Sequence, residues 1–231
     1  MDRFRLITGF LCVLLVACND EGEGHIVRHF EPPEMWMDYQ LWGEEDKENV
    51  TVMLQFRTEG RENSTALLEE PSQVELDGEV LEADSSKMSG IYYEMVKPLA
   101  SFDGKHSILF RDSKGKKYEE KLNFQPFRLK SEIPETVPRR GLMIELEGLE
   151  KESYIRVIAL DTAFYSNGIN TVDTISNGQL FLSEKRLRNL RNGHVHIELF
   201  REDEYRIKNG WKGGGRIAIT YGLKRDFELT D

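Results

Sequence analysis

Three features that would point to a molecular activity are missing from the sequence. There is no surplus of basic residues, because 31 Lys and Arg stand against 41 Asp and Glu, for a net charge of −10. Nucleic-acid binding needs basic residues that neutralise phosphates, so no nucleic-acid partner is expected. A Gly-x-Ser-x-Gly nucleophile elbow and a His-Glu-x-x-His zinc motif are also absent. We therefore predict no catalytic activity and no cofactor.

Long apolar runs and cysteines are scarce as well. The N-terminal run, residues 6–17 with the sequence LITGFLCVLLVA, is too short for a membrane-spanning helix, which needs about 20 residues. Because Arg3 and Arg5 precede it, the run is typical of a secretory signal peptide. Cys12 lies inside this run and would be removed with it, which leaves Cys18 as the other cysteine of the chain.

Cys18 ends the tetrapeptide Leu-Val-Ala-Cys directly after the apolar run. This tetrapeptide resembles the lipobox of bacterial lipoproteins. The resemblance implies cleavage before Cys18, lipidation of its thiol and anchoring in the outer membrane of the cell envelope. Several acyl chains would make this anchor effectively permanent. The alternative is an ordinary signal peptide or a short anchor, with a cysteine at this position by chance.

The lipobox reading divides the N-terminus into two segments. Residues 1–17 would be the lipoprotein signal peptide, and residues 18–30 would be a tether. Asp20, Glu21 and Glu23 make this tether similar to the acidic stretch of surface-exposed Bacteroidota lipoproteins. The mature chain would then hold no pair of thiols, so its stability must come from apolar cores without disulfides.

Strand-like patterns fill most of the remaining sequence. Apolar residues alternate with polar ones over residues 50–56, and Asp77-Gly78 and residues 112–115 predict two hairpins. Further strands are predicted at residues 194–200, 216–221 and 226–229. Residues 183–193, SEKRLRNLRNG, predict one or two helical turns.

The spacing of these strands predicts an all-β fold with two β-sandwiches. Three prolines within residues 126–138 indicate a crossing between them, so we expect one sandwich at residues 31–126 and the other at 127–231. The arrangement resembles tandem immunoglobulin-like domains, although the Cys pair and the Trp between the cysteines are lacking. The alternative is a single β-barrel.

One stretch of the predicted strand at residues 194–200 carries metal-binding residue types. On a strand, His194, His196 and Glu198 would share one face and would ligate a zinc-like ion, as in a metal-dependent hydrolase. Alternatively they form an outward polar face, with the residues between them in the core. The second interpretation accounts for the whole segment without a metal, so we predict none.

Candidate binding residues fall into an aromatic set and a basic set. Trp36 and Trp42 belong to a predicted first strand, where they either pack into the sandwich or stay exposed to stack on sugar rings or fill a partner's pocket. Packing is the interpretation that we favour. Trp211 precedes the glycine triplet of residues 213–215, which predicts a mobile loop tip. The basic set either docks an acidic surface or anionic headgroups or is simply solvated, and it comprises Lys185, Arg186, Arg188 and Arg191.

Two Asp-Thr tripeptides, beginning at Asp161 and Asp173 in a predicted loop region, resemble the acceptor motif of Bacteroidota O-glycosylation. Taken together, the sequence favours a lipid-anchored cell-envelope binding or scaffold protein without catalytic activity. Its expected partners are the membrane, through the anchor, and an envelope protein or a glycan. The alternatives are a glycan-binding accessory lipoprotein and a metal-dependent hydrolase.

Overall fold

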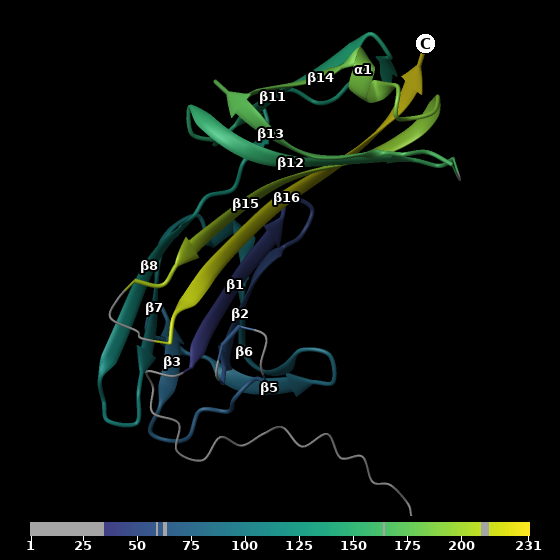
Figure 1. Cartoon of the computed structure of the whole chain (residues 1–231). Helices are drawn as coiled ribbons and strands as arrows, with labels where there is room; N and C mark the ends of the chain where they lie inside the picture. Colours follow the sequence, from purple (N-terminus) through teal and green to yellow (C-terminus); the bar gives the residue numbers. More distant parts are fainter. Residues whose placement is uncertain (1–34, 59, 62–63, 164, 209–212) are drawn as a thin grey trace, which may run out of the picture.

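The computed structural model describes residues 35–231 apart from residues 59, 62–63, 164 and 209–212 (Figure 1). The predicted signal peptide, Cys18 and the tether lie outside the described residues. Among the described residues, no helix is both long enough and apolar enough to cross a membrane. The fold is all-β, with 63% strand and 4% helix arranged in sandwich-like sheets, which confirms the predicted fold class at this level.

The first part of the chain forms eight strands, and the second part forms the rest together with one short helix. The first set is β1 (Trp36–Glu44), β2 (Asn49–Arg57), β3 (Gln73–Leu76), β4 (Glu79–Val80), β5 (Glu82–Ser86), β6 (Gly90–Pro98), β7 (Gly104–Arg111) and β8 (Lys117–Phe124). The second set is β9 (Arg128–Leu129), β10 (Thr136–Pro138), β11 (Gly141–Glu147), β12 (Glu152–Asp161), β13 (Ile169–Ser176), β14 (Gln179–Ser183), α1 (Glu184–Leu187), β15 (Gly193–Arg206) and β16 (Gly215–Thr230).

These strands build one large and one small sheet. The large sheet has the order β5-β6-β2-β1-β16-β15-β12-β13-β14-β11-β9, and β10 also pairs with β16. The small sheet, β4-β3-β7-β8, lies across from the β6-β2-β1 part of the large sheet. At the other end, the large sheet turns back on itself, so that β11 and β14 lie above β12 (Figure 1).

The hairpin β15–β16 joins the two ends of the molecule. Its strands pair continuously from Gly193 opposite Leu229 to Arg206 opposite Arg216. The first half of β16 pairs in parallel with β1, whereas its last residues pair with β10. The sequence predicted shorter, separate strands here, but residues 222–225 continue the pairing with β15 without a break. A continuous sheet thus crosses the predicted boundary at residues 126/127, and the division into two domains stays a prediction.

The core follows directly from the alternation within the strands. In β1, Met37, Tyr39 and Leu41 are each only 1% exposed, and they pack toward the small sheet with aromatic residues such as Phe56 and Phe110. Phe56 lies 5.0 Å from Phe110 between ring centroids. Burial of each such side chain contributes about 1.5–3 kcal/mol, so strands with this pattern have a defined inward face.

Several local predictions are confirmed and one is wrong. Asp77 and Gly78 form a tight turn between β3 and β4, both with positive φ values of 51° and 86°. The hairpin around residues 112–115 joins β7 to β8, and α1 is the predicted helical turn. Asp173 does not lie in a loop, however, because residues 169–176 pair with β12 as β13.

Candidate functional site

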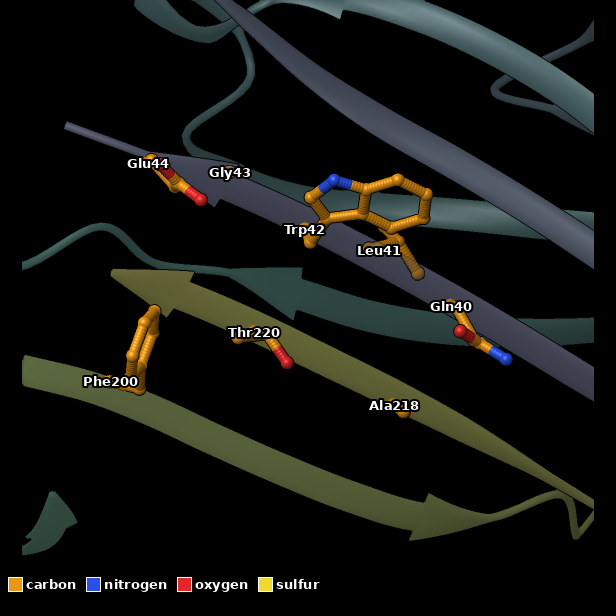
Figure 2. Close-up of a pocket in the computed structure, with 8 residues that line it drawn as sticks. All are labelled: Gln40, Leu41, Trp42, Gly43, Glu44, Phe200, Ala218 and Thr220. Carbon is orange, nitrogen blue, oxygen red and sulfur yellow. The ribbon is translucent and has the colours of Figure 1, made fainter. Parts of the chain in front are cut away.

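The outward face of β1, β16 and β15 carries a shallow trough with a volume of about 280 Å³ (Figure 2). Side chains of Gln40, Trp42 and Glu44 come from β1, those of Ala218 and Thr220 from β16, and that of Phe200 from β15. Trp42 stands opposite Thr220 in the pairing of β1 with β16. Three neighbouring strands therefore place two aromatic rings beside a surface of small residues.

Trp42 points outward because the alternate residues of β1 fill the core. The residues on its two sides, Leu41 and Gly43, face inward, and a Cβ on Gly43 would come within 3.1 Å of the Phe124 ring. Trp42 keeps 38% of its surface exposed, which is unusual for so large an apolar side chain. The favoured interpretation, that Trp36 and Trp42 pack into the sandwich, is therefore wrong, because the inward positions of β1 are Met37, Tyr39 and Leu41.

Phe200 owes its position to the glycine across the strand pair. Gly222 is its partner on β16, and a Cβ on Gly222 would lie only 2.6 Å from two carbons of the Phe200 ring. The ring can lie against β16 only because this position has no side chain. Phe200 is partly exposed and lines the trough at the end where Glu44 lies, across Gly222 of β16 (Figure 2).

The acidic side chains near the trough are held by cations. Glu44 accepts a hydrogen bond of 2.9 Å from Lys224, whose pKa is raised mainly by this bond. Glu202, on the same face of β15, accepts a bond of 2.9 Å from Arg156. The trough therefore presents paired carboxylates together with the neutral Gln40 amide and Thr220 hydroxyl. The Thr220 hydroxyl forms no hydrogen bond with any of the described residues.

Trp36 lies on the same face of β1 but has a different role. Its ring covers Gly214, where a Cβ would lie 2.9 Å from the ring, and its Nε1 is buried without a partner among the described residues. A Cβ on Gly213 would lie 2.0 Å from the carbonyl oxygen of Met35. Residues 213–215 thus pack tightly against the start of β1, so the predicted mobile loop tip is wrong for the triplet. Trp211 lies outside the described residues.

His194, His196 and Glu198 share an outward face of β15, as the strand pattern predicted, and the residues between them are fully buried. The ring nitrogens of the two histidines contact carboxylates of β16 and of β15 itself. His196 contacts Asp226 at 2.9 Å through Nδ1 and Glu198 at 3.4 Å through Nε2, and these bonds raise its pKa, Asp226 most strongly. His194 lies 3.2 Å from Asp226 as well.

This arrangement does not favour the metal-dependent hydrolase. Within the described ranges, no group of three or more His, Cys, Asp or Glu side chains is placed to hold a metal ion. The histidines instead contact carboxylates along the strand face. Lys224 lies 3.6 Å from Glu198 and also pairs with Glu44, so this row of polar contacts reaches the trough.

The basic set of residues surrounds α1, at the end of the molecule opposite β3 and β7 (Figure 1). Arg186 forms an ion pair of 2.8 Å with Asp173 and a hydrogen bond with the Thr171 hydroxyl, which fixes α1 to β13. Arg188 pairs with Glu184 one turn earlier. Lys185 and Arg191 are exposed. The structure therefore divides this set between packing contacts and solvated charges.

A second hollow, of about 660 Å³, lies over β7 and β8 beside Tyr205. Its lining carries Lys, Asp and Glu side chains of both signs. His106 within it contacts Asp77 at 2.7 Å and the carbonyl oxygen of Phe102 at 3.0 Å, and its ring stacks on Phe102. His106 is thus engaged in local packing.

Sequence reasoning singled out Trp42 but missed its neighbours. Phe200, Ala218 and Thr220 lie about 160 to 180 residues away along the chain, and only the pairing of β1 with β16 brings them together. The sequence did contain a sign that Phe200 lies on the surface. The alternation that turns Val195, Ile197 and Leu199 inward turns this aromatic residue outward.

No family model matches the chain, and the search of curated proteins gives no match either. Solved structures give only distant likenesses. The IG1 and IG2 domains of DIP-gamma are 12% identical, with 82% of this chain and 96% of that chain covered and a TM-score of 0.24. A bacterial ice-binding adhesin is 8% identical, with coverages of 85% and 65% and a TM-score of 0.26.

A third likeness is to SGBP-B of Bacteroides ovatus, solved with a mixed-linkage heptasaccharide. It is 10% identical, with 85% of this chain and 60% of that chain covered and a TM-score of 0.20. TM-scores this low carry no argument about the function or the ligand of this chain. The tandem immunoglobulin-like arrangement likewise stays a prediction.

Proposed function

We propose that the protein is a non-catalytic binding protein of the cell envelope, anchored in the outer membrane through Cys18. The observation that carries this proposal is the exposed Trp42, held beside Phe200 on a face of three paired strands. Trp is the residue type most enriched at the energetic centres of binding surfaces. Because β1 is paired with a strand on each side, the backbone that carries this ring is held in place before a partner arrives, which lowers the entropic cost of binding.

The charges around the trough support a binding role over a catalytic one. General acid–base catalysis needs a group that is able to exchange a proton with the reacting molecule. Glu44 and Glu202 instead accept hydrogen bonds from Lys224 and Arg156, which fix the positions of the two carboxylates. This arrangement suits a surface that recognises a partner and leaves it unchanged.

The anchor is tested by replacing Cys18 with Ser. The full chain and the Cys18→Ser variant are each expressed in a bacterium of the same envelope type and separated into membrane and soluble fractions. We expect the variant to leave the membrane fraction, because it lacks the thiol that would carry the lipid. A variant that stays with the membrane to the same extent would contradict the anchoring.

The binding surface is tested in living cells with a photo-activated cross-linking residue at Thr220. The matched control carries the same residue at Ser176, an exposed position of β13 that does not line the trough. We expect a cross-linked adduct, with protein or with glycan, from position 220 and not from position 176. Equal or absent adducts at the two positions would contradict the proposed binding surface.

A further inference from the structure

We infer that the ligand of the trough is a neutral saccharide, bound by stacking on Trp42 and Phe200. This inference rests on the proposed binding role of the same surface. It names the chemistry of the partner, which the proposed function leaves open between protein and glycan.

The first argument is the presence of two aromatic rings in the lining of one shallow trough. Trp42 of β1 stands opposite Thr220, whereas Phe200 of β15 stands opposite Gly222, the next outward position of β16, and the small side chains of Thr220 and Ala218 continue the surface along β16 (Figure 2). A flat ring with an apolar face fits such a surface, because aromatic side chains provide broad contact area at a low cost in conformational entropy. A pyranose has this shape and presents C–H groups on its faces.

The second argument is the set of polar groups at the rim. The Gln40 amide nitrogen donates to Asp38 at 3.3 Å, which leaves its second N–H and its carbonyl oxygen for a ligand. The Thr220 hydroxyl offers a donor and acceptors, and the Glu44 carboxylate offers acceptors in a position fixed by Lys224. Sugar hydroxyls are themselves both donors and acceptors, so each of these groups has a complementary partner on a saccharide. An aliphatic ligand would leave them without hydrogen bonds, which costs binding free energy.

The third argument is charge. The chain carries a net charge of −10, and the carboxylates beside the trough are already neutralised by Lys224 and Arg156. An anionic polymer would meet this negative field, and none of the described residues that line the trough is a free cation that would compensate it. A cationic ligand would have to displace Lys224 or Arg156 from its partner. A neutral ligand has neither cost.

The size of the trough also limits the ligand. At about 280 Å³ it lies below the range of about 300–1,000 Å³ that encloses drug-sized molecules. The trough therefore suits one short section of a longer chain that passes across the sheet, which is how a polysaccharide would be held. An inserted side chain of a protein partner is the competing occupant.

The test uses the full, lipidated chain purified in detergent. Native gels are cast with soluble neutral polysaccharides, namely a glucan, a mannan, a xylan and a galactan, and with polygalacturonate as the anionic comparison. Any polysaccharide that retards the protein is then titrated by calorimetry. The same titration is made with Trp42→Ala, Phe200→Ala and Thr220→Val, and with Phe181→Ala as the control, because Phe181 is an exposed ring on the distant β14.

We expect at least one neutral polysaccharide to bind and polygalacturonate not to bind. Trp42→Ala and Phe200→Ala should each raise Kd at least about tenfold, equivalent to about 1.4 kcal/mol, while Phe181→Ala leaves Kd within about twofold. Thr220→Val preserves the shape of the side chain and should raise Kd about threefold or more through loss of the hydroxyl. Thermal unfolding of each variant verifies that it is folded.

Two results would overturn the inference. The first is the absence of binding to every neutral polysaccharide of the panel. The second is binding that is equally strong in the folded Trp42→Ala and Thr220→Val variants. If position 220 cross-links to a protein in cells while no polysaccharide binds, the saccharide inference fails and the proposed binding surface stands. If position 220 forms no adduct and polysaccharide binding is insensitive to Trp42, both fail.

Discussion

The ring of Phe200 lies against Gly222, its partner across the β15–β16 pair, at a distance that leaves no room for a side chain. This contact connects the fold to the candidate site. Gly222 sits in β16 between Tyr221 and Leu223, whose buried side chains cover the inward face of the strand, while the Phe200 ring covers its outward face. The same contact holds Phe200 beside the trough.

A methyl group at position 222 should therefore displace Phe200. We expect Gly222→Ala to lower the free energy of unfolding by about 1–3 kcal/mol, the usual cost of overpacking, as measured by chemical denaturation. The control is the double variant Gly222→Ala with Phe200→Ala, in which the clash is relieved. If the double variant is destabilised by the sum of the two single effects, the two residues are not coupled and the contact is not as described.

The two tryptophans of β1 should respond differently to truncation. Trp36 packs on Gly214, so Trp36→Ala should lower the free energy of unfolding by about 2 kcal/mol. Trp42 is exposed, so Trp42→Ala should change it by less than about 1 kcal/mol. Thermal or chemical denaturation measures both. An equal loss in the two variants would show that Trp42 serves the core and is not kept for binding.

Arg225 joins two segments that are far apart along the chain. It donates hydrogen bonds of 2.7 Å to Glu132, between β9 and β10, and to Glu45, after β1, and these bonds, the one to Glu132 first, raise its pKa above the usual value. We expect Arg225→Gln to destabilise the protein by about 1–2 kcal/mol, since both carboxylates lose a charged partner. The Glu132 side chain is mostly exposed, so Glu132→Gln should lower the free energy of unfolding by less than Arg225→Gln does. A larger loss for Glu132→Gln would contradict this account.

The pH dependence of stability should report on His196. Its pKa is raised in the folded state by Asp226 and then by Glu198. The stabilisation is therefore complete below the unfolded pKa of about 6.5 and is lost as the pH rises through the higher folded pKa. His196→Gln should thus reduce stability more at pH 5.5 than at pH 8.5, by chemical denaturation at both values. Asp226→Asn should remove most of the same pH dependence, and an unchanged dependence in both variants would exclude this pair as its source.

The all-β fold was predictable from the sequence because alternation of apolar and polar residues carries the information for a half-buried strand. The turn at Asp77-Gly78 was predictable for a similar local reason, since these residues adopt the positive φ that the turn requires. The outward direction of Trp42 was not, because the apolar Met37, Tyr39 and Leu41 compete with Trp36 and Trp42 for the same core.

The site was less predictable than the fold because it is assembled from distant strands. Register between β1 and β16 decides that Trp42 stands beside Thr220, and nothing in either segment alone specifies that register. The histidines illustrate the same limit. Their common face on β15 was readable from sequence spacing, but Asp226, the carboxylate that engages them, comes from the neighbouring strand β16.

Hydroxyl-radical footprinting of Trp42 is the most direct measurement of the central claim, that this face of the sheet binds a partner in the envelope. The oxidation of Trp42 is compared between intact cells and the purified full chain, with the exposed Tyr154 of β12 as the internal reference. We predict that Trp42 is protected in cells relative to the purified protein, while the oxidation of Tyr154 is unchanged. Equal oxidation of Trp42 in the two samples would contradict the claim.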